Sequence, residues 1–156
     1  MRRRRGITLI ELMIVMAILA ILAAIIHPMI MDAARDVESI TMAATVRAVR
    51  QRIEIHGSSG DSPLSIEGYP NQIVPNWFPR SALPRDAWTL RPLFIQVVHG
   101  PKQATEPNNK TFNLTAGGQA AGHTAWYNAA NGSFCAKVPN RGSEDDIQEL
   151  FHLVNG

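Results

Sequence analysis

A long apolar stretch opens the chain. From Ile7 to Met31 every residue is hydrophobic except Thr8, Glu11, His27 and Pro28. A helix of this length, which rises about 1.5 Å per residue, is long enough to cross a bilayer. The pattern therefore predicts a membrane-spanning helix over residues 7–31.

The hydrophobic pattern becomes amphipathic over residues 32–57. Apolar residues recur there at helical spacing with charged residues mostly between them, which predicts a helix with one apolar face. The predicted face consists of Val37, Ile40, Ala44, Val46, Val49 and Ile53. We expect Pro28 to bend or loosen this helix, because proline removes a backbone donor, and Gly57 to end it. A helix from Ile7 to His56 would measure about 75 Å. Its first half would pack on copies of itself and its second half on its own globular head.

Turn residues dominate the next part of the chain, residues 58–92, and strand-like runs follow it. Six prolines there break any long helix, yet aromatic residues indicate an ordered connection rather than a disordered linker. Its apolar residues, Ile66 and Trp77 among them, are expected to dock on the helix. The strand-like runs occupy residues 93–98, 111–115, 123–128 and 133–138. Asn131-Gly132 predicts a hairpin between the last two runs, with a loop of either two or three residues.

The last part of the chain, Ser143 to Val154, predicts a short helix. Ser143 and Asp146 have the spacing of a capping box, and the apolar residues that follow share one helical face. Taken together, these elements predict an α+β protein. Its long N-terminal helix packs on a small antiparallel sheet head with a short C-terminal helix.

One carboxylate lies inside the predicted membrane helix. Glu11 would cost several kcal/mol in hydrocarbon if it were unpaired, so we expect it to have a partner. Four arginines, Arg2 to Arg5, precede the helix. Because positive residues stay on the cytoplasmic side of a membrane, they direct the C-terminal part of the chain outward.

The segment Gly6-Ile7-Thr8-Leu9-Ile10-Glu11-Leu12 resembles the processing and methylation motif of type IV pilins and type II secretion pseudopilins. The resemblance implies a pilin-like fold, cleavage after Gly6 by a prepilin peptidase, and N-methylation of the new terminal residue, Ile7. That residue is usually phenylalanine in the family. The acid of the motif matches Glu11, and the proline that often bends the family's helix matches Pro28. Glu11 is therefore expected to meet the Ile7 ammonium of a neighbouring subunit, which would set the register of a filament.

Two further segments resemble the heads of G-type pseudopilins. Leu83 to Trp88, LPRDAW, is similar to their Pro-x-Asp-x-Trp segment, although Thr89 replaces the usual glycine after the tryptophan. The second segment, AWYNAANGSFCAKVP, is similar to their Trp-Tyr-Asn…Gly-x-Phe hairpin. The favoured interpretation is therefore a structural subunit of a type II secretion pseudopilus, possessing no enzymatic activity of its own.

This interpretation divides the chain into a cleaved leader (1–6), a transmembrane and assembly helix (7–31), an amphipathic half-helix (32–57) and a globular head (58–156). The expected location is the bacterial inner membrane in a single pass, with a periplasmic head and a periplasmic filament after assembly. The expected partners are further copies of the chain, the prepilin peptidase and methyltransferase, other pseudopilins and the inner-membrane assembly platform.

Charge and cysteine content add two restrictions. The chain has a net charge of +2, but loss of the leader removes four arginines and leaves 11 basic against 13 acidic side chains. The basic pI therefore does not argue for nucleic-acid binding, and none is expected. With Cys135 as its one cysteine the chain forms no intrachain disulfide, so the thiol is expected to be buried as a small apolar group. An intermolecular disulfide is the alternative.

No catalytic or cofactor motif emerges from the remaining residues. The five histidines are scattered without metal-ligand spacing, so no zinc site is expected. Asp145 and Asp146 admit a calcium site, but helix capping explains both acids without metal. Three Asn-x-Ser/Thr triplets begin at Asn109, Asn113 and Asn131, and we expect no modification there, since such triplets are common by chance.

Alternatives stay open at this point. The chain would instead be a type IV pilus subunit or minor pilin that serves adhesion, motility or DNA uptake. Two alternatives belong to other functional classes, an unprocessed membrane-anchored binding module and a membrane-anchored enzyme. A conventional secretory signal cleaved near Ala23 and Ala24 would remove the apolar helix, whereas cleavage at Gly6 keeps it.

Overall fold

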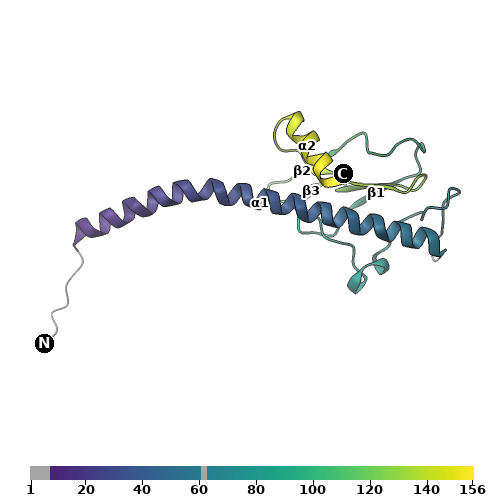
Figure 1. The fold of residues 1–156 in the computed structure, drawn as a ribbon, viewed down its shortest axis with the longest axis horizontal. Coiled ribbons are helices and arrows are strands. Elements are labelled where there is room, and N and C mark those ends of the chain that lie inside the picture. The colour runs from purple at the N-terminus through teal and green to yellow at the C-terminus, as the bar shows by residue number, and fades with distance from the viewer. Residues whose placement is uncertain (1–7, 61–62) are drawn as a thin grey trace. The chain divides into compact units, whose positions relative to one another are not determined.

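The computed structural model describes residues 8–60 and 63–156. The chain divides into two compact units, with the boundary between Val37 and Glu38. The long helix α1, Leu9–Ser59, supplies most of the first unit and one element of the second (Figure 1). The predicted α+β fold class is confirmed, because the second unit adds small sheets and a short C-terminal helix.

Helix α1 remains helical through Pro28, which lies inside it. Gly57 does not end the helix, which continues to Ser59. The residue that follows, Gly60, has φ +69°. A glycine in the left-handed conformation just past the last turn is a common helix ending, since it has no Cβ to clash.

The face of α1 that the head covers differs in part from the predicted face. Its buried residues are Ser39, Met42, Val46, Val49 and Ile53. The prediction is confirmed for the last three. It was wrong for Val37, Ile40 and Ala44, which are exposed, the first two to 63%. The two sets each keep helical spacing, but Val46 follows Ile40 by six positions, and six steps of about 100° place them on different sides of a helix.

Two three-stranded sheets form the rest of the head. One has the order β1–β4–β5, with bounds Ile95–Val98, Ala125–Asn128 and Ser133–Ala136. The other has the order β3–β2–β6, with bounds Ala120–Ala121, Thr111–Leu114 and Val138–Pro139. The predicted hairpin is present as the antiparallel pair β4–β5. Parallel pairs, β1 with β4 and β2 with β6, accompany it.

The hairpin loop is longer than either alternative that the pattern offered. Asn128 pairs with Ser133, which leaves residues 129–132 in the loop. Gly132 has φ +73°, and both Asn131 and Gly132 donate their backbone N–H to Asn128 O, at 3.3 and 2.8 Å. This register places Trp126 opposite Cys135.

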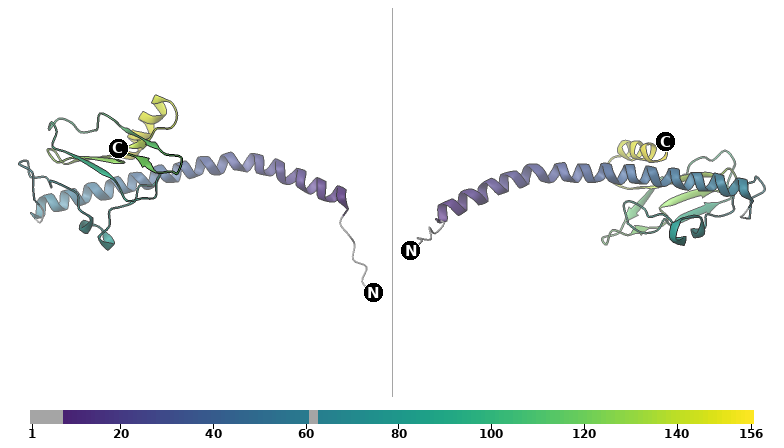
Figure 2. Two further views of the ribbon diagram at one scale, coloured as in Figure 1. Left: turned by 180° about the vertical axis from the view of Figure 1, so that it is seen from behind. Right: turned by 60° about the horizontal axis from the view of Figure 1, so that its bottom comes forward.

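The core of the second unit lies between α1 and the β1–β4–β5 sheet, and helix α2, Glu144–Asn155, closes one end of it (Figure 2). Tyr127 and Phe134 from the sheet are buried together with Phe151 from α2. The Tyr127 hydroxyl donates to Pro70 O at 2.7 Å. Burial raises the pKa of this phenol, because its ionised form loses hydration.

Residues 63–92 of the irregular connection before the sheets are ordered, as predicted. It contains two short 3-10 helices, Pro75–Trp77 and Pro79–Ser81. Trp77 is buried and stacks on His56 of α1 with ring centroids 4.4 Å apart. Ile66 was expected to dock as well, but it is fully exposed at a turn. The turn from Ser65 to Gly68 closes without it, through Gly68 N donating to Ser65 O at 3.0 Å.

Asp86 organises a tight turn inside the LPRDAW segment. Its buried Oδ1 accepts the backbone N–H groups of Trp88 and Thr89 at 2.9 and 2.8 Å. Burial raises the pKa of Asp86 despite these hydrogen bonds. Leu90 closes the turn by donating its N–H to Asp86 O at 2.9 Å, and it has φ +56°. The left-handed position of this turn is thus Leu90 rather than Thr89.

We expect Leu90→Gly to stabilise the head by about 1 kcal/mol, because the left-handed conformation costs a residue with a Cβ roughly that much. Little packing is lost, since the Leu90 side chain is 71% exposed. Thermal unfolding of the detergent-solubilised chain measures the change. Thr89→Gly is the matched control, and it should destabilise slightly because Thr89 has no positive φ to relieve. An equal gain from both variants would contradict this account.

Candidate functional site

The N-terminal part of α1 presents apolar surface on every side. Among its large hydrophobic residues from Leu9 to Met31, exposure ranges from 77% at Leu9 to 47% at Leu22. By length and composition this helix is able to cross a membrane, with a mean hydropathy of 3.0 over its most apolar window. Water is a poor solvent for such a surface, so lipid or protein has to cover it.

Glu11 has a partner within its own chain. Its Oε2 accepts the backbone N–H of Thr8 at 2.8 Å and the Thr8 hydroxyl at 3.0 Å. In return, the backbone N–H of Glu11 donates to Thr8 Oγ1 at 3.3 Å. This reciprocal arrangement is a capping box, which satisfies donors at the start of a helix. The other carboxylate oxygen, Oε1, makes no hydrogen bond among the described residues.

The remaining predicted site residues do not gather around Glu11. Gly6 and Ile7, the predicted cleavage and methylation residues, lie outside the described residues. Pro28 lies in the same helix as Glu11, and 17 intervening steps of about 1.5 Å separate the two by roughly 25 Å. The functional part of α1 is therefore an extended surface rather than a compact pocket.

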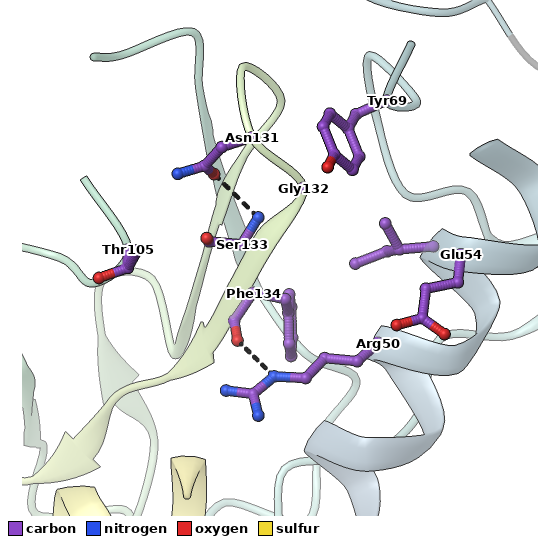
Figure 3. A pocket seen from close by; sticks show the side chains of 9 residues that line it. Arg50, Glu54, Tyr69, Thr105, Asn131, Gly132, Ser133 and Phe134 are labelled. Atoms are coloured by element: carbon purple, nitrogen blue, oxygen red, sulfur yellow. Dashed lines mark hydrogen bonds between the residues drawn. The ribbon is translucent and has the colours of Figure 1, made fainter. Parts of the chain in front are cut away.

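In the head, Arg50 joins α1 to the sheet and to α2. Its Nε donates to Phe134 O at 3.1 Å, and its Nη2 donates to Asn155 O at 2.7 Å. The side chain borders a cavity of about 380 Å³ between α1 and the hairpin (Figure 3). Glu54, Tyr69 and Ser133 also line the cavity. Through these two carbonyl oxygens the Arg50 guanidinium links α1 to the hairpin and to α2.

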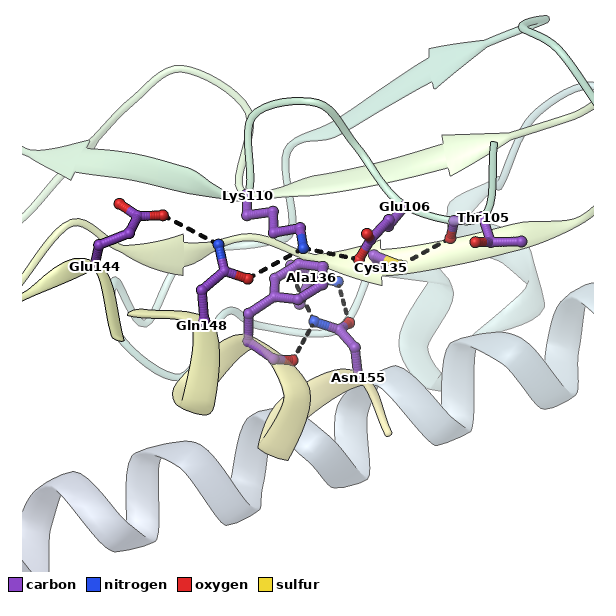
Figure 4. A network of polar contacts seen from close by, with 9 residues as sticks. Thr105, Glu106, Lys110, Cys135, Ala136, Glu144, Gln148 and Asn155 are labelled. Atoms are coloured by element: carbon purple, nitrogen blue, oxygen red, sulfur yellow. Dashed lines mark hydrogen bonds and ion pairs between the residues drawn. The ribbon is translucent and has the colours of Figure 1, made fainter. Parts of the chain in front are cut away.

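Asn155 attaches α2 to strand β5, because its side-chain amide forms the pair of hydrogen bonds that a neighbouring strand would form. Its Oδ1 accepts the backbone N–H of Ala136 at 2.8 Å, and its Nδ2 donates to Ala136 O at 3.0 Å (Figure 4). A second attachment uses Lys110, which pairs with Glu106 at 3.0 Å and donates to Gln148 at 3.2 Å. These contacts hold the C-terminal helix in one position.

The single thiol is buried within the same region. Cys135 is 4% exposed, and its Sγ lies 3.4 Å from Thr105 O. Burial raises the pKa of Cys135, although nearby Arg50 acts in the opposite direction. A thiol with these properties is a poor nucleophile, since the thiolate is the reactive form. The prediction of a buried Cys135 is confirmed.

Polar residues elsewhere in the head serve its structure. Asp146 forms the predicted capping box, accepting the Ser143 N–H at 2.9 Å and the Ser143 hydroxyl at 2.7 Å. These hydrogen bonds lower the pKa of Asp146, because they favour its charged form. Within residues 8–60 and 63–156, no group of three or more His, Cys, Asp or Glu side chains lies in an arrangement that could hold a metal ion.

Three sets of structural contacts were not predicted from the sequence. The Thr8–Glu11 capping box has a recognisable spacing, Thr-x-x-Glu at the start of an apolar helix, and could have been found. Arg50 and Asn155 carry no such signal. Their partners are backbone carbonyl and amide groups far away in the chain, and any residue supplies these.

Comparison with protein families gives one match. Residues 1–26 match the family model described as a prokaryotic N-terminal methylation motif. Neither the curated proteins nor the solved structures contain a significant match to the chain. The matched segment includes the first part of α1, from Leu9 to Ile26, and with it Glu11.

Proposed function

We propose that the chain is a member of the type IV pilin and pseudopilin family and the structural subunit of a type II secretion pseudopilus. The observation that carries this proposal is the methylation motif placed directly on a helix that is apolar all round. Its activity is self-assembly, and the chain performs no covalent chemistry. It is instead the substrate of the peptidase and methyltransferase.

Residues 1–6 form the leader, and a prepilin peptidase cleaves between Gly6 and Ile7. The new amine of Ile7 is then methylated. Until assembly, residues 7–31 hold the chain in the inner membrane, with Arg2 to Arg5 on the cytoplasmic side and the head on the periplasmic side. Cleavage at this point retains the apolar helix, which the filament requires.

Glu11 sets the register of the filament by meeting the Ile7 ammonium of a neighbouring copy. Its own capping box uses Oε2 alone, which leaves Oε1 for the ammonium. Opposite charges attract more strongly in an apolar surrounding than in water. One carboxylate therefore serves two purposes, since it caps its own helix and also binds the next subunit. Pro28 contributes to assembly by weakening the backbone hydrogen bonding of the helix at its position.

Features of the head favour a secretion pseudopilin over a pilus subunit. The Asp86 turn corresponds to the Pro-x-Asp-x-Trp segment, and β4–β5 to the Trp-Tyr-Asn…Gly-x-Phe hairpin. Both are similar to G-type pseudopilins, and both lie in the region 58–156 that we assign to the head. Other pseudopilins and the inner-membrane platform are the partners that this assignment implies.

Mass spectrometry of the native N-terminus tests the proposal. We expect a chain that begins at Ile7 and carries an added methyl group. As a control, Gly6→Leu places a bulky side chain at the cleaved bond and should leave the leader in place. A native chain that still contains Arg2 to Arg5 would instead indicate an unprocessed membrane-anchored protein.

A further inference from the structure

Both Asn-Gly pairs of the chain lie where their asparagines hold the head together. The pairs are Asn131-Gly132, in the β4–β5 loop, and Asn155-Gly156, at the end of α2. Asparagine is among the residues that degrade chemically on heating. It does so most readily before glycine, because glycine has no side chain to keep its backbone nitrogen away from the asparagine amide carbon. These two pairs are therefore the positions at which the sequence favours that reaction.

The reaction is deamidation, and it consumes only water. The glycine nitrogen attacks the asparagine Cγ, which forms a C–N bond and closes a five-membered succinimide ring. The proton of that nitrogen leaves with the side-chain nitrogen as ammonia. Water then opens the ring at one carbonyl to give aspartate, or at the other to give isoaspartate, whose backbone contains an additional methylene. The whole conversion takes up one water and releases one ammonia.

The folded loop withholds Asn131 from this reaction. Its Nδ2 donates to Lys102 O and Ala104 O at 2.8 and 2.9 Å, and its Oδ1 accepts the backbone N–H two residues further along at 2.9 Å (Figure 3). Gly132 N, the atom that would attack, keeps its proton in a hydrogen bond to Asn128 O at 2.8 Å. Other partners thus hold both the amide and the attacking nitrogen.

Asn155 has the same arrangement in a different part of the fold. Its Nδ2 donates to Ala136 O and Phe151 O, both at 3.0 Å, and its Oδ1 accepts the backbone N–H of strand β5 at 2.8 Å (Figure 4). Gly156 N donates to His152 O at 2.8 Å. A loop and a helix end therefore share one pattern. In each, the amide donates to two carbonyl oxygens, and the glycine N–H is bound to the carbonyl four residues earlier.

We propose that Asn131 and Asn155 are deamidation sites that become reactive only when the head opens, and that their conversion prevents the head from closing again. A hydrogen-bonded backbone N–H gives up its proton only after the structure around it has opened. Conversion to aspartate replaces the donor by an oxygen that faces two carbonyl oxygens, and isoaspartate also lengthens the backbone there. A chain that is modified while open cannot refold, so its loss is irreversible. This inference concerns the head alone and is independent of the proposed function.

Peptide mass spectrometry of the full chain in detergent measures conversion at both sites. We expect the native chain to convert roughly tenfold or more slowly than the same chain with its head unfolded in guanidinium, at one mildly alkaline pH and temperature. Equal rates in the two states at either site would refute the protection.

A destabilised head tests whether opening controls the rate. Asn155→Ala leaves the backbone groups of Ala136 without their partners, so the head should open more often. We expect Asn131 in this variant to convert roughly tenfold or more faster than in the wild-type chain without denaturant. An unchanged rate would mean that the loop opens by itself, and would overturn the proposal.

The effect of the product is tested by substitution. Asn131→Asp places a carboxylate against Lys102 O and Ala104 O, so we expect the head to melt about 5–10 °C lower and to lose protease resistance. Asn113→Asp is the matched control, since the exposed Asn113 side chain only accepts a hydrogen bond, from Asn140 Nδ2 at 3.2 Å, and a carboxylate accepts it equally. This control should melt with the wild type. Wild-type melting of Asn131→Asp, or equal losses from both variants, would contradict the proposal.

Discussion

Replacing Glu11 by alanine is expected to lower the yield of filaments at least tenfold while the leader is still removed. In the proposed filament, the carboxylate binds the Ile7 ammonium of the next copy, so its loss would leave that ammonium unpaired in an apolar surrounding. Processing precedes this pairing and does not require it. Sedimentation of sheared filaments, with the N-terminal mass of the membrane-stored fraction, measures both quantities.

The capping box makes a second variant necessary. Glu11 also accepts hydrogen bonds from Thr8, so its removal disturbs the helix start as well as the contact between copies. Thr8→Val removes the hydroxyl of the box but keeps the carboxylate, and it should leave filament yield near wild type. Equal losses from Thr8→Val and Glu11→Ala would assign the effect to capping alone. Normal filaments from Glu11→Ala would refute the proposed pairing.

Asn155→Ala should have the largest effect on the stability of the head. The substitution leaves the backbone N–H and C=O of Ala136, which is fully buried, without their partners. Unsatisfied buried groups of this kind cost about 1–3 kcal/mol each. We therefore expect a loss of about 2–4 kcal/mol in the free energy of unfolding, and a melting temperature lower by about 10 °C. Thermal unfolding in detergent, followed by near-ultraviolet circular dichroism, measures the change.

Two comparisons identify the cause of that loss. Asn155→Asp keeps the acceptor for Ala136 N–H but replaces the donor by a charged oxygen that faces the carbonyl oxygens of Ala136 and Phe151, so it should destabilise at least as much as the alanine variant. Gln148→Ala removes a hydrogen bond to Lys110 from the same helix at a half-buried position, and about 1 kcal/mol is expected. An Asn155→Ala protein that unfolds at the wild-type temperature would show that the backbone groups of Ala136 find other partners.

Local patterns predicted most of the elements and the β4–β5 hairpin, but not how strands far apart in the chain pair. The apolar run of α1, the Asn131-Gly132 hairpin and the Ser143–Asp146 capping box each depend on residues close in the chain. Their signals are accordingly visible in short windows. The parallel pairing of β1 with β4 joins Ile95 to Ala125 across a long connection. No local periodicity encodes which distant strand a given strand will meet.

The misassigned face of α1 has a different physical reason. Val37, Ile40 and Ala44 keep helical spacing among themselves, as Val46 and Val49 do. The spacing within each set was predicted correctly, but the two sets lie on different sides of the helix. Helix α1 has apolar residues on two sides, and an interpretation that assumes one apolar face merges the two sets.

The single buried thiol of Cys135 bears on how the head would fold after the export that we propose. Its architecture contains no covalent cross-link, so it attains the native state without an oxidant or an isomerase. Reductants added outside the cell should leave its melting behaviour untouched. In the secretion role that we propose, widely different periplasmic redox conditions would then place no additional demand on the folding of this subunit.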